Sequence, residues 1–219
     1  MRFITTIFCL TPLLLTGCLS KMMDNRISNA VYVGAYAQTI GKWDISRRAY
    51  AQAVVDSEVV EWPPARRAIL HYEYGRALGV TCFFAASAFE LMSAYQLDEI
   101  SGGPLYMSLT ELARLHLDQK KYRIAAEFYQ KSFVEQDKAD VSSGAPIAYA
   151  DTLDEYAIAL KEIGETQKSE AMSAKANELR TKYPDWKSVT GRTPYGTQCT
   201  QSVEEVNAVP TSNVKPTPQ

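Results

Sequence analysis

The sequence KKYRIAAEFYQKSF, from Lys120 to Phe133, has the residue spacing of a single α-helix. Within it Tyr122, Ala125, Tyr129 and Ser132 follow one another at intervals of three, four and three residues, so they share one helical face. Large and small side chains alternate on this face. A small residue between two aromatic rings lets a neighbouring helix come close while the rings fill the space beside it. The pattern therefore predicts a helix that packs tightly against a partner helix.

The partner helix is expected immediately upstream. There Leu109, Leu112, Ala113 and His116 share one helical face, and a short polar turn, 118–120, follows them. Two helices joined by such a turn are the unit of a tetratricopeptide repeat (TPR), and this segment resembles the TPR pattern W-x2-L-G-x2-Y followed by A-x3-F. The resemblance implies a stack of helical hairpins.

The same pattern occurs four times between residues 27 and 182. The place of the L-G glycine recurs at spacings of 41, 38 and 44 residues, longer than the ~34 of a regular repeat, which fits longer second helices or longer loops. These four positions are Gly34, Gly75, Ala113 and Ala157. The other second helices carry the large/small code at Trp43, Ser46, Tyr50 and Ala53, at Phe84, Ser87, Leu91 and Ala94, and in degraded form at Thr166, Ser169, Ser173 and Ala176.

We therefore expect an all-α fold, a TPR-like α-solenoid of about four helix-turn-helix repeats over residues 29–183, with an irregular to disordered tail over 184–219. The last repeat helix, 166–182, is rich in Ser, Lys, Glu and Gln, as a terminal capping helix should be. In the tail, Tyr195 and Cys199 are the candidates for an anchor on the folded domain. An unrelated helical bundle is the alternative.

The N-terminus has the features of a secretion signal. A short basic start precedes an apolar run over residues 3–15 that is too short to be a good membrane span. The run ends in LTGC at 15–18, which resembles the lipobox of bacterial lipoproteins. The resemblance implies a signal peptide over 1–17, a lipidated tether over 18–28 and covalent lipid on Cys18, and Leu19 after it points to the periplasmic side of the outer membrane. An ordinary signal peptide with a chance cysteine is the alternative.

The remaining cysteines suggest one disulfide. Of the four cysteines, Cys9 leaves with the signal and Cys18 carries lipid, so Cys82 and Cys199 are the one possible pair in an oxidising periplasm. Two free thiols are the alternative. A metal site or other cofactor is not expected, because the chain has two histidines and no C-x-x-C spacing.

Composition and motifs argue against two functional classes. The chain has 219 residues, of which 46% are hydrophobic, and a net charge of -2, without the basic block that nucleic-acid binding requires. None of the common hydrolase, zinc-protease or nucleotide-binding motifs occurs, so we expect no enzyme. The carboxylates Asp151, Asp154, Glu155 and Glu162 lie on one predicted helix, and we interpret them as a solvated face rather than an acid/base pair.

The first helices of stacked repeats would line a groove for a partner. The candidates are Tyr72, Arg76, Thr110 and Arg114, because the two arginines hold equivalent places in adjacent repeats and could bind a carboxylate or acidic segment. Alternatively, each arginine forms an ion pair within the scaffold or is solvated. The whole predicted groove face comprises Val31, Ala35 and Gln38, then Tyr72, Arg76 and Val80, then Thr110, Arg114 and Leu117, and finally Asp154, Ile158 and Lys161. The carboxylate clamp of some TPR proteins is not reproduced, since Val31 and Ala35 replace its first Lys and Asn.

Together, the repeats and the lipobox resemble periplasm-facing repeat lipoproteins. The resemblance implies a membrane-anchored scaffold or adaptor with protein partners in the cell envelope, acting in the assembly of a pilus, secretion or envelope-biogenesis machine. A cell-wall enzyme, or a direct regulator of a cell-wall hydrolase, is the alternative.

Overall fold

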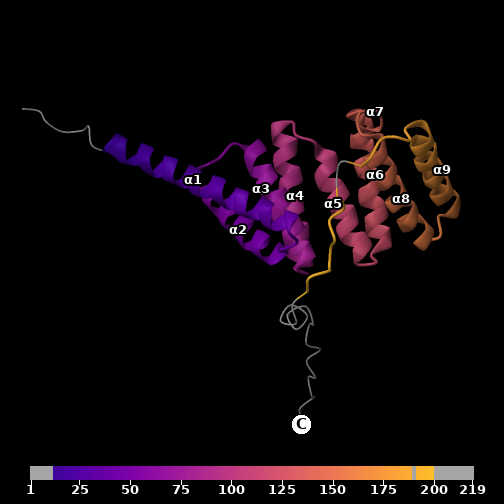
Figure 1. The fold of residues 1–219 in the computed structure, drawn as a ribbon, viewed down its shortest axis with the longest axis horizontal. Coiled ribbons are helices and arrows are strands. Elements are labelled where there is room, and N and C mark those ends of the chain that lie inside the picture. Colours follow the sequence, from indigo (N-terminus) through magenta and orange to yellow (C-terminus); the bar gives the residue numbers. More distant parts are fainter. Residues whose placement is uncertain (1–11, 189–190, 200–219) are drawn as a thin grey trace, which may run out of the picture.

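The computed structural model describes residues 12–188 and 191–199, with side chains from residue 21 onward (Figure 1). Within these ranges the ordered elements are helices, and no strand occurs. In chain order they are α1 (Pro12–Thr39), α2 (Trp43–Val59), α3 (Pro64–Val80), α4 (Phe84–Ser101), α5 (Leu105–Asp118), α6 (Tyr122–Lys138), α7 (Val141–Gly144), α8 (Pro146–Glu162) and α9 (Thr166–Lys182).

The helices form four pairs that stack one after another. Helix α1 packs on α2, α3 on α4, α5 on α6 and α8 on α9, and each pair contacts the next along the chain (Figure 1). The short helix α7 lies between the third and fourth pairs. This arrangement confirms the predicted all-α, TPR-like α-solenoid.

The turn inside each pair has the same backbone geometry. The residue two positions before the second helix has a left-handed φ in all four repeats: 70° at Gly41, 72° at Cys82, 58° at Lys120 and 84° at Gly164. Glycine adopts this conformation without steric cost, whereas Cys82 and Lys120 adopt it against their preference. Cys82, which forms a disulfide, therefore lies at a turn position that has the same backbone geometry in each repeat.

Two hydrogen bonds establish the register of the repeats. Ser87 Oγ donates to the carbonyl oxygen of Gly75 over 2.7 Å, and Ser169 Oγ donates to that of Ala157 over 2.8 Å. Each joins the small position of a second helix to the L-G position of its first helix. The two helices of the first pair also pack closely, because a Cβ on Gly34 would lie only 2.7 Å from Cε2 of Tyr50. The predicted alignment of the repeats is confirmed at these positions.

The core consists of three clusters of buried residues along the stack. The largest joins α5, α6, α8 and α9 around the fully buried Tyr129, whose neighbours include Phe133 and Tyr149. This burial confirms the packing role predicted for Tyr129. Helix α9 buries Ser169 and Ala176 alone and leaves its other face polar, as a terminal capping helix requires.

Both ends of the repeat region differ from the sequence prediction. Residues 18–28, expected to form a tether, belong to the continuous helix α1, and Ile27 is fully buried. Asp24 Oδ1 also accepts a 2.7 Å hydrogen bond from Trp62 Nε1, so the folded domain begins before residue 29. The tail is irregular, as predicted, but its residues 191–199 pack against the solenoid.

Residues 1–11 of the predicted signal and 200–219 of the tail lie outside the described residues. Within the described part, no helix is long and apolar enough to span a membrane.

Candidate functional site

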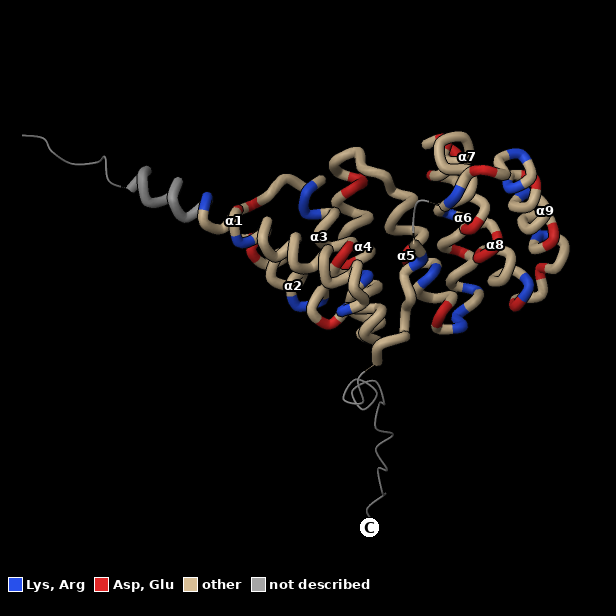
Figure 2. Tube along the Cα trace, in the orientation of Figure 1, with Lys and Arg blue, Asp and Glu red and all other residues tan. Residues whose placement is uncertain are grey.

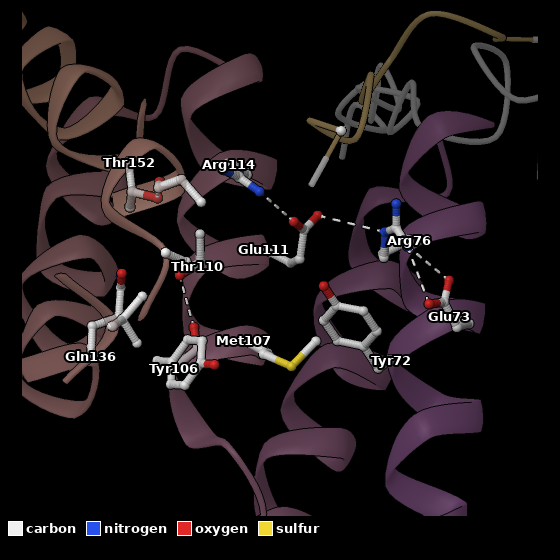
Figure 3. Close-up of a pocket in the computed structure, with 14 residues that line it drawn as sticks. Tyr72, Glu73, Arg76, Tyr106, Met107, Thr110, Glu111, Arg114, Gln136 and Thr152 are labelled. Carbon is white, nitrogen blue, oxygen red and sulfur yellow. Dashed lines mark hydrogen bonds and ion pairs between the residues drawn. The ribbon is translucent and has the colours of Figure 1, made fainter. Parts of the chain in front are cut away.

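A hollow of about 320 Å³ lies between the first helices α3, α5 and α8 (Figure 3). The four residues predicted to face a partner, Tyr72, Arg76, Thr110 and Arg114, all line it. Its remaining wall is mostly apolar or uncharged and includes Tyr106, Met107, Gln136, Val141, Ala148 and Thr152.

Other residues of the predicted groove face lie elsewhere. Val80 and Leu117 belong to the buried core, because the last turns of α3 and α5 face the interior and the tail rather than solvent. Val31 and Ala35 lie on α1, outside the hollow, and Gln38 donates a 2.9 Å hydrogen bond to Glu73. Asp154 pairs with Arg180, whereas Ile158 and Lys161 are exposed.

Both arginines of the hollow are ion-paired within the scaffold, the alternative interpretation of the sequence. Arg76 Nη1 lies 2.9 Å from Glu73 Oε2, and Arg114 Nη1 lies 2.8 Å from Glu111 Oε1. Glu111 also faces Arg76 at 4.0 Å, so one buried carboxylate lies between the two guanidinium groups (Figure 3). The arginines therefore do not present an uncompensated positive charge to an acidic partner.

The ion pairs continue into one alternating network. Arg114 Nε reaches Glu155 Oε2 on α8 at 2.7 Å, and Tyr129 donates to the same oxygen over 3.0 Å. Arg192 of the tail then pairs with Glu155 at 3.0 Å and donates to Asp118 over 2.9 Å. Acidic and basic residues are interspersed along the whole solenoid (Figure 2), and in this network they alternate from α3 across α5 to α8.

Glu111 stays ionised despite its burial. Burial raises the pKa of the Glu111 carboxyl, but Arg114, Arg76 and hydrogen bonds from Thr193 and Tyr195 outweigh that effect and bring the pKa below its ordinary value. For Arg76 and Arg114, burial lowers the pKa of each guanidinium, and the neighbouring carboxylates more than reverse this. The network is therefore charged at neutral pH, and its acidic and basic groups are paired with one another.

The tail segment 191–199, here called the strap, lies across α3 and α5. In Figure 1 the chain returns from α9 across the solenoid toward the α3–α4 turn. Thr193 is fully buried and accepts a 2.8 Å hydrogen bond from Arg76 Nε. Tyr195 is also buried, and its hydroxyl donates to Glu111. The strap therefore supplies groups that complete the charge network.

A disulfide closes the end of the strap. Cys199 is bonded to Cys82, with their Cα atoms 5.1 Å apart, as the cysteine count suggested. Cys82 is buried in the left-handed turn between α3 and α4, whereas Cys199 is exposed. The bond joins positions separated by 117 residues.

The carboxylates of α8 do not form the single solvated face predicted from the sequence. Glu155 is mostly buried within the network, because it faces α5 and the strap. Asp151 and Asp154 share Arg180 of α9, at 2.8 and 2.7 Å. Glu162 alone is exposed and matches the prediction. In the described residues no group of three or more His, Cys, Asp or Glu side chains could hold a metal ion.

Sequence reasoning missed Glu111 and Arg192, and it assigned Glu155 to a solvated face. One signal was present: Glu73 and Arg76 are three residues apart, and so are Glu111 and Arg114 in the next repeat. Side chains at this spacing are neighbours on a helix, so the repeated E-x-x-R pattern indicated ion-paired arginines.

Comparison with known proteins supports the fold. The structure is similar to BtubC (BKLC) from P. vanneervenii, with a TM-score of 0.69 and 14% identity over 78% of this chain and 69% of that one. It is also similar to MamA, with a TM-score of 0.59 and 15% identity over 78% of this chain and 87% of that one. Kinesin light chain TPR-like repeats from Podosopora anserina give a TM-score of 0.58 and 16% identity over 73% and 77% of the two chains. No family model and no curated protein matches the sequence. These likenesses define a TPR-like helical-repeat protein.

Proposed function

We propose that this chain is a membrane-anchored scaffold that binds one or more protein partners in the bacterial cell envelope. Its task would be the assembly of a periplasmic or outer-membrane machine, such as a pilus, secretion or envelope-biogenesis system. The observation that supports this best is the hollow between consecutive repeats. Its aromatic and apolar walls, with arginines that are ion-paired within the scaffold, suit a side chain of a protein partner.

The anchor is proposed to be lipid on Cys18. Cleavage before this residue would place the lipid six positions before Asp24, whose side chain is hydrogen-bonded to Trp62. At ~1.5 Å per helical residue that is about 9 Å, because α1 is continuous there. The solenoid would then be held close to the outer membrane rather than on a long flexible tether.

We propose no catalytic role. Asp151, Asp154 and Glu155, the carboxylates that could suggest acid/base chemistry, each have an arginine partner. An arginine that holds a carboxylate within the scaffold occupies its oxygens, which does not suit an acid/base catalyst.

Palmitate labelling with membrane fractionation tests the anchor. The wild-type chain and the Cys9→Ser variant should both carry label and sediment with outer membranes, because the proposed mature protein lacks Cys9. The Cys18→Ser variant should lose both properties, since acyl chains supply the membrane affinity. Unlabelled wild-type protein would overturn the proposed anchor.

Capture of partners from native envelopes tests the scaffold role. Met107→Glu places a charge in the wall of the hollow, whereas Phe89→Glu places one on an exposed position of the second helix α4. Partner recovery should fall for Met107→Glu and stay at the wild-type level for Phe89→Glu. Equal recovery with all three proteins would show that the hollow is not the partner site.

A further inference from the structure

The strap occupies the surface of α3 and α5 in the way that a bound peptide would. Its backbone amides at Gly196 and Gln198 donate to the carbonyl oxygens of Gly79 and Val80, over 3.1 and 3.0 Å. The strap turns at this point, since Gly196 has a left-handed φ of 72°. Main-chain hydrogen bonds of this kind hold a segment whatever its sequence, and side-chain pockets then select among segments. The side chain that fills such a pocket is that of Tyr195, which is 4% exposed.

Gly79 makes the slot for this aromatic ring. A Cβ at this position would overlap the ring of Tyr195. Gly79 is distinct from the L-G glycine of the same repeat, Gly75, where a Cβ would instead meet Leu91. Helix α3 thus has a second glycine, which admits an aromatic side chain from outside the helical pairs. The hydroxyl of that side chain reaches Glu111 at the bottom of the slot.

The surface beneath the strap is acidic. Without the strap, this surface has two arginines and four carboxylates, which gives a net charge of -2. Arg192 of the strap reduces this net charge to -1. The six groups of the surface are Arg76, Arg114, Glu73, Glu111, Asp118 and Glu155. Arg192 meets the two carboxylates that lie farthest from Arg76 along the network. The surface therefore favours a cation three residues before an aromatic ring, which is the reverse of the acidic partner predicted from the arginines alone.

We propose that this surface of α3, α5 and α8 is a docking site for a partner segment with a basic residue three positions before an aromatic one. The strap is its built-in competitor, and the disulfide holds it in place. The inference rests on the proposed adaptor function, since it specifies the chemistry of a partner.

Reduction of the disulfide would release the strap. A dithiol breaks the S–S bond with two electrons and two protons, gives two thiols and is itself oxidised to a disulfide. Non-covalent contacts alone then hold the strap on this surface, and a partner segment can displace it.

The test uses the full chain and a labelled synthetic peptide, GRTPYGTQ, which has the sequence of residues 191–198. A variant with Arg192→Ala, Tyr195→Ala and Cys199→Ser weakens the strap and leaves the surface of α3, α5 and α8 unchanged. This variant should bind the peptide at least about tenfold more tightly than oxidised wild-type protein, because a tethered competitor acts at a high effective concentration. Equal binding by the two proteins, or none by the folded variant, would overturn the proposal.

Matched peptides test the chemistry of recognition. Peptides with Glu in place of the arginine, or Ala in place of the tyrosine, should each bind the strap-weakened variant about tenfold more weakly. Equal binding of all three peptides would refute the docking site.

If the variant does not fold, oxidised and dithiothreitol-reduced wild-type proteins are compared instead. Peptide binding that does not increase on reduction would refute the role of the disulfide in holding the strap. Palmitate labelling of Cys18 has no part in these measurements, so failure here is distinct from failure of the proposed anchor.

Discussion

The hydroxyl of Tyr195 donates a 2.7 Å hydrogen bond to Glu111 Oε2, although the two residues are 84 positions apart in the chain. Both residues are buried, and the carboxylate accepts this bond while it faces Arg114 and Arg76. The contact therefore fastens an irregular tail to the centre of a helical solenoid.

Replacing Tyr195 should separate the contributions of its ring and its hydroxyl. Tyr195→Phe removes one donor from a buried carboxylate and should lower the free energy of unfolding by about 1.5–3 kcal/mol. Tyr195→Ala also empties the slot at Gly79 and should cost about 3–5 kcal/mol. Urea unfolding measures both values. Equal stability of the Phe and wild-type proteins would mean that this hydrogen bond contributes nothing.

The sequence was sufficient for the helix pairs and insufficient for the strap, for a physical reason. Tyr122, Ala125 and Tyr129 reveal a helical face because the helix places them together locally. No periodicity links Tyr195 to Glu111, so that contact could not be read from spacing. The disulfide was accessible by counting cysteines, whereas the path of the strap between α9 and Cys199 was not.

The charges of the candidate residues follow the alternative interpretation of the sequence. Arg76 and Arg114, at equivalent places in consecutive repeats, both line one hollow and form ion pairs within the scaffold. Arg114 is neutralised partly by Glu155, which comes from helix α8 of the next repeat. The start of the domain was placed too late because α1 extends beyond the repeat pattern, and Ile27 packs against the second helix of the first pair.

Arg114 should be important for stability rather than free for a partner. Arg114→Met leaves Glu111 and Glu155 in a buried site without their shared cation, which should lower the free energy of unfolding by about 3–5 kcal/mol. The control is Arg48→Met, because Arg48 forms an exposed pair with Asp44 and should contribute at most about 1 kcal/mol. Similar losses in the two variants would contradict the buried network.

The disulfide should stabilise the chain mainly by constraining the unfolded state. For a loop of 117 residues the expected gain is up to about 4–5 kcal/mol, which reduction or Cys199→Ser should remove. Addition of dithiothreitol to the Cys199→Ser protein should change nothing, which controls for other effects of the reductant. Mass spectrometry of unreduced, alkylated wild-type protein should find no label on Cys82 or Cys199.

Tyr129 should be among the most sensitive positions of the core. Tyr129→Ala removes a fully buried ring from the cluster of α5, α6, α8 and α9 and should cost about 3–5 kcal/mol. Tyr32 is 70% exposed on α1, so Tyr32→Ala should stay within about 0.5 kcal/mol of wild type. A thermal melt compares the three proteins, and an unchanged melting temperature for Tyr129→Ala would show that the repeat packing is misassigned.

Acidification should destabilise the chain through His116. Burial, and secondarily the charge of Lys121, lowers the pKa of this imidazole below its ordinary value of 6.5, while its ring stacks on Phe128 with 5.6 Å between centroids. The unfolded chain therefore binds a proton more readily than the folded one, so stability is greatest above pH 6.5 and falls as the pH drops through and below that value.

Urea unfolding at several pH values between 7.5 and 5.5 should show this loss in wild type and a flatter profile in His116→Gln. Lys121→Gln should also flatten the profile, though less, because it relieves the secondary cause of the pKa shift and leaves the burial in place. A profile that is as steep in His116→Gln as in wild type would assign the acid sensitivity to other groups. Since the turn at Lys120 and Lys121 joins α5 to α6, the same comparison reports whether that turn keeps its cation close to the imidazole in solution.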